Sequence, residues 1–390
     1  MPLFIDLPKG QITTPEFRIV GWVATDDDLS TLAVFVNGSQ VEHLVMDRPD
    51  LRSVPELAAF ATTAAVAAQV RLGKSDDATT IAIELRCGAE RHSQEISVAF
   101  DSVELDATQE ALRATARAFV ERHLLCPSCR ARNSTFEWIE GHLRCLVCHM
   151  ILPQATRAIN TIRAELVAGS DLSETGNVSS NPYTVDALAL IDSVVGQGGW
   201  VLDCGAGRRP ERRANVVNLE IVDFESTDVL GVGEALPFQD NTFDAVLSLA
   251  VLEHVRDPVR CAREIMRVLK PGGMVLADVP FLQPVHGFPN HYYNMTQAGL
   301  TNLFVESGDV LACKVPLHGH PILALRWLLS EYLAGLPESA RGHFAAMTAG
   351  ELADLDPVHF ITSDHPAAAV LAPESQAVIS CLNSILVRKR

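Results

Sequence analysis

The stretch Trp200-Val-Leu-Asp-Cys-Gly-Ala-Gly207 carries the strongest fold signal in the chain. Its apolar residues Val201 and Leu202 predict a buried strand, and the glycines that follow predict a tight turn. Gly205 and Gly207 have no side chain, so the backbone can approach a ligand closely. A strand that runs into such a turn is typical of parallel α/β sheets that bind a cofactor at the carboxyl ends of their strands. By itself, this pattern fits NAD, flavin and S-adenosylmethionine (SAM) sites equally.

The segments that follow decide between these cofactors. VVNLE at Val216–Glu220 predicts a second strand that ends in a carboxylate, which can accept hydrogen bonds from ribose hydroxyls. The next segments are, in order, GEALPF (233–238), NTFDAVLS (241–248), VLEHV (251–255), RVLKPGG (267–273) and a strand expected over Met274–Val279.

In this order the segments resemble the class I SAM-dependent methyltransferases, most closely the methyltransferase type 11 branch with the pattern LPF, FD, LEHV and RVLKPGG. The resemblance covers about residues 180–315, with a final strand near Ala377–Arg388. It implies a C-terminal α/β Rossmann-like domain of seven strands over residues 181–390, with SAM as its cofactor.

The resemblance also implies which residues hold SAM. Asp203 and the turn at Gly205 and Gly207 would hold the methionine part, and Glu220 would accept from the ribose hydroxyls, with Asp223 as its rival. The remaining expected positions are Tyr183, which would cover the cofactor; Glu234, Ala235 and Leu236, which would flank the adenine; Ala250, which would face the sulfonium; and His254, which would line the cofactor pocket.

Two positions depart from the family pattern. Arg209 stands where a third glycine is common, and Gly233 stands where an acidic residue is usual. Either SAM binds with fewer contacts, or Glu234 and Arg208 compensate.

The segment VPFLQPVHGFPNHYYN (279–294) concentrates histidines, tyrosines and prolines after the expected fifth strand. Methylation of a hydroxyl needs a proton acceptor, and histidine titrates near neutral pH. His286 or His291 is therefore the candidate general base, and Tyr292 and Tyr293 would shape the acceptor pocket. The alternative is a loop that buries its aromatic rings and uses histidine only as a hydrogen-bond donor.

Four cysteines form two CxxC pairs, Cys126 with Cys129 and Cys145 with Cys148. Each turn lets two thiolates face one ion, and two turns complete a tetrahedral shell that suits Zn²⁺. Such a closed site stabilises a fold and performs no chemistry; redox pairs or coincidence are the alternative. The segment resembles the zinc ribbons found beside several methyltransferases. With a connecting helix over 106–123 and a hairpin around Gly141, it makes a second domain, 106–153.

The first 105 residues predict a β-sandwich accessory domain. The expected strands are Phe17–Val23, Leu32–Val36, Thr80–Leu85 and Glu95–Val103, and the alanine-rich stretch 55–70 is expected to be a loop or a helix. Asn37-Gly38 predicts a type I′ hairpin turn. With GWV at 21–23 and Arg48-Pro49-Asp50, the segment resembles the immunoglobulin-like sandwiches of bacterial glycan enzymes. Packing or dimerisation, and carbohydrate binding, are the two roles left open.

Two further segments complete the predicted organisation. Residues 154–180 form a linker, and residues 316–372 form a helical insertion between the last two strands of the methyltransferase domain. Within the insertion, Pro321–Leu336 predicts an amphipathic helix that packs in a core, closes as a lid or joins a homo-oligomer.

Charge and composition narrow the partners and the location. The formal charge is −17, and only residues 121–153 escape the acidic excess, with a net charge of +1. An acidic surface repels phosphate backbones and disfavours nucleic acid as a partner. The start MPLFIDLPKG lacks the features of a secretion signal, and the stretch Leu57–Val70 is shorter than the ~18–20 residues of a membrane span. These features predict a cytoplasmic protein.

The sequence therefore predicts a SAM-dependent methyltransferase with a structural Zn²⁺ ion. Its acceptor would be a hydroxyl or other heteroatom of a small molecule or a glycan precursor, the glycan being inferred only from the sandwich resemblance. One alternative is an rRNA or tRNA base methyltransferase, because Arg122, Arg130, Arg132 and Arg144 offer a small basic patch. The other is a non-catalytic SAM-binding or assembly protein, given the two departures from the family pattern.

Overall fold

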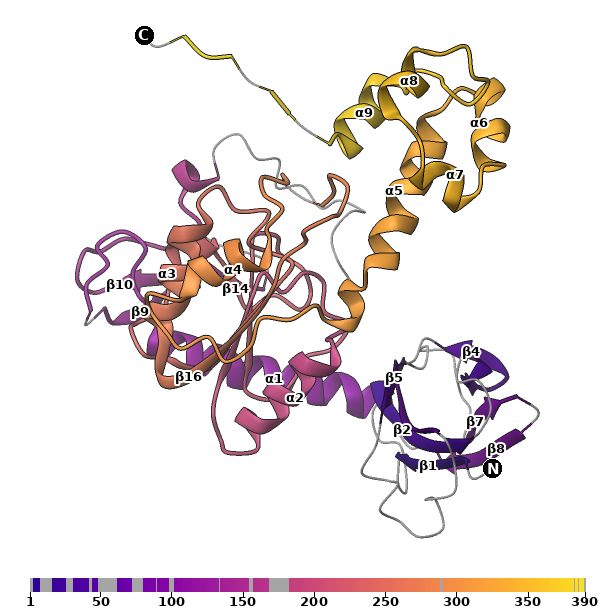
Figure 1. Ribbon diagram of the computed structural model, residues 1–390. Helices are drawn as coiled ribbons and strands as arrows, with labels where there is room; N and C mark the ends of the chain where they lie inside the picture. Colours follow the sequence, from indigo (N-terminus) through magenta and orange to yellow (C-terminus); the bar gives the residue numbers. More distant parts are fainter. Residues whose placement is uncertain are drawn as a thin grey trace. The chain divides into compact units, whose positions relative to one another are not determined.

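The chain divides into two compact units, Met1–Ala111 and Leu112–Arg390 (Figure 1). The computed structural model describes residues 3–7, 16–25, 31–41, 44–47, 62–71, 80–88, 90–97, 102–132, 134–153, 157–167, 182–287, 290–381, 383–384 and 386–388.

The first unit contains two antiparallel sheets of four strands each. One has the order β1 (Leu3–Leu7), β2 (Glu16–Thr25), β6 (Thr62–Arg71), β5 (Leu44–Asp47); the other has the order β4 (Ser39–Val41), β3 (Ala33–Val36), β7 (Thr80–Cys87), β8 (Glu90–Ser97). Both sheets contribute to one buried core, with Ile19 and Val66 from the first and Ile83 from the second. Asn37 and Gly38 both have positive φ, so the predicted hairpin turn is confirmed.

Two expectations for this unit were wrong. The alanine-rich stretch contains β6, because Ala64, Val66, Ala68 and Val70 alternate into the core with the period of a strand. The strand expected over Glu95–Val103 ends earlier, at Ser97, and helix α1 already begins at Ser102. Arg48, Pro49 and Asp50 lie outside the described residues, and the immunoglobulin-like resemblance stays a prediction.

The second unit is built around a parallel sheet of six strands. Its order is β11 (Ile159–Asn160), β14 (Val229–Leu230), β13 (Val216–Glu220), β12 (Val201–Cys204), β15 (Phe243–Leu249), β16 (Leu269–Asp278). β12 lies between β13 and β15. The chain therefore adds β13 and β14 on one side of β12, and β15 and β16 on the other. Parallel sheets bind ligands at such a switch point, outside the carboxyl ends of the strands.

The seven-stranded sheet predicted from the resemblance is wrong for the part of the chain that the structure describes. The segment expected to form the last strand, 377–388, begins inside helix α9 (Pro373–Ile379) and has no strand after it. The sixth strand is β11, which comes from the segment predicted as a linker and pairs with β14.

Helices cover both faces of this sheet. Neighbouring residues in one strand point to opposite faces, and α2 (Val185–Val195) packs with Val201 while α3 (Pro258–Val268) packs in the cluster that contains Leu202. A further helix, α4 (Gln297–Phe304), contributes Leu300, Leu303 and Phe304 to the α3 side. Thr184 and Asp257 cap α2 and α3, each by accepting a backbone N–H.

The cysteine segment is built onto the α3 face of the sheet. It comprises the end of α1 (Ser102–His123) and the hairpin of β9 (Phe136–Ile139) with β10 (His142–Cys145). The helix predicted over 106–123 is thus confirmed. Phe119 stacks on Trp200 with ring centres 3.8 Å apart, and Leu143 belongs to the same buried cluster as the sheet. The hairpin and the sheet therefore share one core.

The turn after β12 does not continue into a helix. Residues 206–215 form an irregular loop before β13. Pro210 lacks an N–H donor and disfavours helical backbone at the residue before it, Arg209. This loop carries Arg208, Arg209, Arg212 and Arg213 close to the carboxyl ends of the strands.

The last part of the chain is helical. It contains α5 (Pro321–Gly335), α6 (Glu338–Ala345), α7 (Ala349–Ala353), α8 (Pro357–Thr362) and α9. The helix predicted over Pro321–Leu336 is confirmed as α5, and Leu336, Phe344 and Phe360 form a small core of their own. Because no described strand follows, this segment is not an insertion between two strands. Among the described residues, no helix is both long and apolar enough to cross a membrane.

Candidate functional site

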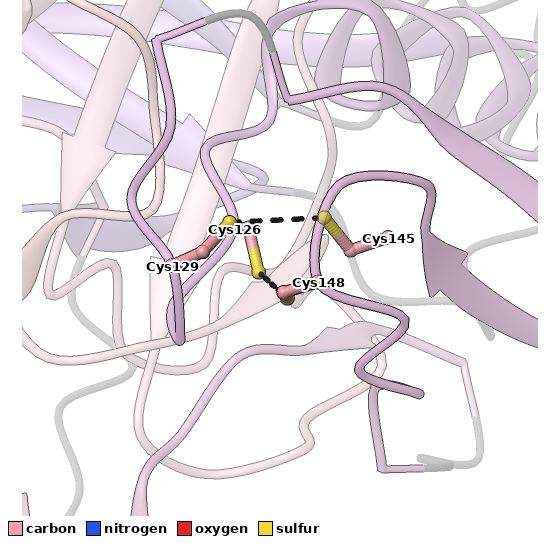
Figure 2. Close-up of side chains that lie close together, drawn as sticks. All are labelled: Cys126, Cys129, Cys145 and Cys148. Carbon is pink, nitrogen blue, oxygen red and sulfur yellow. Dashed lines mark hydrogen bonds between the residues drawn. The ribbon is translucent and has the colours of Figure 1, made fainter.

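The four paired cysteines converge on one point, as Figure 2 shows. The Sγ atoms of Cys126 and Cys148 are 3.6 Å apart, those of Cys129 and Cys145 are 3.9 Å apart, and all four lie within 4.8 Å of one another. In a tetrahedral zinc site with Zn–S distances of about 2.3 Å, the sulfurs lie about 3.8 Å apart. The geometry of the four thiols therefore fits a single zinc ion.

The two cysteine turns are built alike. In each, the residue after the second cysteine has positive φ, 48° at Arg130 and 60° at His149, and donates its N–H to the carbonyl of the first cysteine. The hairpin between them turns at Gly141, whose φ is 82°, as the sequence predicts. Two matched turns bring both thiol pairs to the same centre.

Asp203, at the end of β12, is the buried centre of the glycine turn. Its Oδ2 accepts hydrogen bonds from the Tyr183 hydroxyl at 2.6 Å and from Arg209 Nε at 2.8 Å. Burial and the Asp203 charge raise the pKa of Tyr183 well above its usual range, so the phenol keeps its proton and donates. Oδ1 of Asp203 is buried and has no hydrogen-bond partner among the described residues. One carboxylate oxygen is therefore left for a ligand.

Arg209, the first departure from the family pattern, lies inside this site. Its side chain is 7% exposed, and its guanidinium carbon lies 4.0 Å from the centre of the Tyr183 ring. Arg208 instead lies over the ring of Phe224, at 5.2 Å. The sequence reasoning did not foresee the Asp203–Arg209 pair or a second buried pair, Arg212–Asp228. The sequence feature that could have indicated these pairs is the run of arginines at residues 206–215 in an otherwise acidic chain.

Glu220, at the end of β13, holds the glycine turn in place. Its Oε2 accepts the N–H of Gly207 and its Oε1 accepts the N–H of Ile221, both at 2.8 Å. Gly205 and Gly207 have φ of 77° and 64°, and a Cβ on Gly205 would lie 2.5 Å from Val251. Glycine is therefore required for this turn. Burial raises the pKa of Glu220.

Gly233, the second departure, has a steric reason. A Cβ at this position would lie 2.5 Å from Sγ of Cys261, so no side chain fits. The next residue, Glu234, accepts the N–H of Arg256 at 3.0 Å and fixes the segment after β15. Leu236 is fully buried, and a cavity of about 230 Å³ borders Ala235. Of the three residues that the resemblance assigns to adenine, only Ala235 lines this cavity, whose other walls include Pro127, Thr161 and Arg260.

We expect Gly233→Ala to destabilise the protein by roughly 1–3 kcal/mol, because the new methyl group overlaps the Cys261 sulfur. Chemical denaturation measures the free energy of unfolding. The matched control is Gly342→Ala in α6, where an added Cβ meets nothing within 4 Å; it should leave stability unchanged or raise it. The double variant with Cys261→Ala should recover stability, and a failure to recover would contradict the steric explanation.

Glu253, just after β15, is fully buried, and its carboxylate accepts no hydrogen bond from any described residue. Neither carboxylate oxygen has a hydrogen bond to any residue that the structure describes, and Nε2 of His254 lies 3.7 Å from one of them. Burial, with Asp278 nearby, raises the pKa of Glu253 to about 8. Ala250, between β15 and Glu253, has positive φ, 56°, so the chain turns sharply here.

The loop predicted to hold the acceptor packs against this turn. Tyr292 donates its N–H to the Glu253 carbonyl at 2.7 Å, and its hydroxyl accepts from Arg256 Nε at 3.1 Å. The Tyr293 hydroxyl donates to the Arg256 carbonyl at 2.9 Å. Both hydroxyls therefore anchor the loop, and their predicted role in an acceptor pocket stays a prediction.

Three histidine rings gather beside Glu253. The ring centre of His286 lies 4.5 Å from that of His291 and 5.5 Å from that of His254. Nδ1 of His254 bonds the Asn290 carbonyl at 2.7 Å and Nδ1 of His286 bonds the Pro284 carbonyl at 2.8 Å. A carbonyl only accepts, so both Nδ1 atoms carry the proton and both Nε2 atoms keep a lone pair.

His291 is bonded differently from the other two histidines. Its Nδ1 accepts the N–H of His286 at 3.2 Å, and its Nε2 lies 3.1 Å from both the Tyr293 carbonyl and Asn294 Oδ1. Both ring nitrogens of His291 are thus engaged.

Burial lowers the pKa of His254 to about 4 and also lowers the pKa of His286. Of the two predicted bases, His286 is the one whose geometry leaves a lone pair to take a proton.

The basic patch considered for RNA is largely neutralised. Arg130 pairs with Glu264 at 3.0 Å and Arg132 with Asp240 at 3.6 Å. Arg144 pairs with Glu137. Arg122 lines a mostly apolar hollow of about 460 Å³ over α1 and Trp200.

Comparison with known proteins places this site in a family context. Residues 205–277 match the family described as "Methyltransferase domain". A ubiquinone/menaquinone biosynthesis C-methyltransferase UbiE of Pasteurella multocida is 36% identical over 28% of this chain and 42% of its own length. A demethylmenaquinone methyltransferase of Renibacterium salmoninarum is 35% identical over 30% of this chain and 42% of its own length. The chain thus spans about two fifths of these curated relatives.

A solved SAM-dependent methyltransferase from Mesorhizobium loti is 16% identical, with a TM-score of 0.25, over 37% of this chain and 94% of its own. The family match and the curated relatives support a SAM-dependent methyltransferase.

Proposed function

We propose that this protein is a SAM-dependent methyltransferase that transfers a methyl group to a hydroxyl or other heteroatom of a small-molecule acceptor. The observation that carries the proposal is Asp203, which is buried at the end of β12 with one oxygen unpartnered, inside the segment that matches the methyltransferase family. The curated relatives are methyltransferases by name, one of them a C-methyltransferase, and both extend beyond the matched part.

The residues around the glycine turn fit SAM. Its amino group would be held by Asp203 Oδ1 and its carboxylate by the Arg209 guanidinium, so Arg209 supplies a charged contact where the family has a glycine. Glu220 would accept from the ribose hydroxyls, and Asp223 stays its rival. Adenine would lie beside Glu234, Ala235 and Leu236, the residues that the resemblance assigns to it.

The reacting end lies after β15 and β16. SAM supplies a methyl group already activated by its sulfonium, so the protein must align the acceptor and remove its proton. As the acceptor oxygen bonds to the methyl carbon, the bond from that carbon to sulfur breaks and the sulfonium becomes a thioether. Nε2 of His286 would take the acceptor proton, and His291 would hold His286 through its backbone N–H.

The other parts support this reaction from outside. One zinc ion on Cys126, Cys129, Cys145 and Cys148 would stabilise the core shared by the hairpin and the sheet. The two sheets of the first unit are proposed as an accessory domain, and a glycan precursor is the favoured acceptor through their resemblance to glycan-enzyme sandwiches.

Calorimetry with SAM and with its demethylated product tests the cofactor part. We expect both to bind. If neither binds, the result would count against the enzyme and favour the alternative of an assembly protein. Mass spectrometry of small molecules that gain a methyl group after incubation with SAM would identify the acceptor and its atom. Salt-sensitive retention of RNA would instead favour the alternative of an rRNA or tRNA base methyltransferase. The ion pairs formed by Arg130 and Arg144 disfavour that alternative.

His286→Ala is expected to lower turnover by about 10²–10⁴-fold, the usual contribution of a proton acceptor, while SAM affinity stays the same. Single-turnover kinetics and calorimetry measure the two quantities. The matched control is His343→Ala, an exposed histidine of α6 that should behave as the parent protein. Turnover that is undiminished in His286→Ala would rule out this role.

A further inference from the structure

A carboxylate buried without a hydrogen bond needs a compensating partner. Glu253 is 0% exposed, and both its oxygens lack a hydrogen bond within the described part of the chain. Leaving a buried charge unpaired is costly, so such a group either carries a proton or faces a cation. No described lysine or arginine forms an ion pair with Glu253. Within the described ranges, the ion-pair neighbour of Glu253 is Nε2 of His254, at 3.7 Å.

The neighbouring histidines are prepared as ligands. A metal-binding imidazole usually donates its second N–H to a carbonyl or carboxylate, which fixes the ring and turns its lone pair toward the ion. His254 and His286 both do so, through the Asn290 and Pro284 carbonyls at 2.7 and 2.8 Å. Their Nε2 lone pairs are the atoms left to coordinate.

We propose that Glu253, His254 and His286 form a binding site for a divalent transition-metal ion at the carboxyl end of β15, in addition to the cysteine cluster. One ligand atom from each residue lies within 4.8 Å of the other two, a separation that a common ion can bridge. The three ligands come from two segments that backbone hydrogen bonds hold together, since the N–H of Tyr292 donates to the Glu253 carbonyl.

The ligand set selects the class of ion. Two imidazoles and one carboxylate suit Zn²⁺, Fe²⁺ or Co²⁺, whereas Mg²⁺ and Ca²⁺ prefer shells of oxygen. Three protein ligands also leave coordination positions open, unlike the four thiols of the cysteine cluster. The cysteine cluster would therefore be a closed, structural site. The site at Glu253 would keep a coordination position open for an external ligand.

The surroundings favour a rigid site. Gly287 has φ of 75°, and a Cβ there would lie 2.4 Å from Cε1 of His254, so the loop backbone lies directly against this ring. His291 accepts the backbone N–H of His286 and fixes the loop from the other side. Ligands held by packing and by outer hydrogen bonds keep their geometry before the ion binds.

The proposed role of the ion rests on the proposed function, although its binding does not. Glu253 and His254 follow Ala250, which the sulfonium would face, by three and four residues. An ion at this point could bind the oxygen of a hydroxyl acceptor in an open position and make its proton more acidic. With the ion bound, His286 would be its ligand in place of a free base, and the acidified acceptor would release its proton to solvent water.

A titration with Co²⁺ of the full chain loaded with one zinc ion per chain, enough for the cysteine cluster alone, tests the binding in the absence of SAM. We expect one further cobalt ion per chain, with visible absorption bands of nitrogen and oxygen ligands and no thiolate charge-transfer band. Glu253→Gln and His286→Ala should each weaken cobalt binding roughly 100-fold. The matched control is His343→Ala, which should bind cobalt as the parent protein does.

Circular dichroism checks that each variant is folded. If Glu253→Gln does not fold, His286→Ala decides, because its side chain is only half-buried. Absence of a second ion in the parent protein, a thiolate band on cobalt, or unchanged affinity in the folded variants would each overturn the proposal. SAM calorimetry on the same samples separates this failure from a failure of the proposed function, since the two ligands are titrated independently.

Discussion

Cys126→Ser is expected to remove zinc and to destabilise the whole second unit rather than the hairpin alone. Cys126 is buried, and the serine hydroxyl is a poor ligand where three thiolates remain. Structural zinc sites supply about 10–16 kcal/mol of apparent binding free energy in isolated zinc-finger peptides, so even partial loss exceeds the effect of an ordinary substitution.

The shared core transmits this loss to the sheet. Leu143 of the hairpin belongs to the same buried cluster as Leu202 of β12, and Leu125 donates its N–H to Pro237, beside the segment expected to flank adenine. We therefore expect the melting temperature to fall by on the order of 10 °C or more. SAM affinity should fall with it. Metal analysis, thermal unfolding and calorimetry measure the three effects.

Cys381→Ser is the matched control, because Cys381 is an exposed thiol outside the cluster. It should keep one zinc ion per chain and the parent melting temperature. Full zinc content in Cys126→Ser, or zinc loss with an unchanged melting temperature, would contradict a structural metal centre in the shared core.

The sequence predicted the elements whose signals are local. The strand and glycine turn at Trp200–Gly207, the two cysteine turns and the Asn37-Gly38 hairpin each depend on residues adjacent in the chain, and the structure has all of them. The helix α5 was likewise visible from its periodicity.

The wrong predictions concern segments whose structure depends on contacts with residues distant in the sequence. Alanine favours helix by itself, yet β6 is a strand because β2 and β5 pair with it on both sides. The last strand was carried over from the family, and its segment gives α9 in this chain. For Arg209 the sequence left two alternatives open, fewer contacts to SAM or compensation by other residues, because only the fold shows that its guanidinium reaches Asp203.

Asp203→Asn is expected to lower stability and cofactor affinity together. The substitution keeps the shape of the side chain but leaves the Arg209 guanidinium, which is 7% exposed, without its negative partner. Breaking a buried ion pair from one side costs about 3–5 kcal/mol, which corresponds to a fall in melting temperature of roughly 10 °C. The neutral amide oxygen of asparagine also accepts from Tyr183 and Arg209 less strongly than the charged carboxylate does.

The second buried ion pair, Arg212–Asp228, provides a control that separates the loss of stability from the loss of SAM affinity. Asp228→Asn breaks the ion pair with Arg212 at a comparable burial, and the second oxygen of Asp228 accepts the backbone N–H of Asn218. Both variants should lose similar free energy of unfolding. Only Asp203→Asn should also lose SAM affinity, by about 10–100-fold, because its open oxygen would no longer pair with a charged amino group.

Calorimetry at a temperature where both variants are folded measures this difference. Equal SAM affinity in the two variants would show that Asp203 is a structural residue, and the glycine turn would then have to hold the cofactor through its backbone and Glu220 alone. A loss confined to Asp203→Asn, and reproduced by Arg209→Ala, would instead place both charges at the methionine end of SAM. A buried arginine would then perform, by charge, what the family achieves at that position with a glycine.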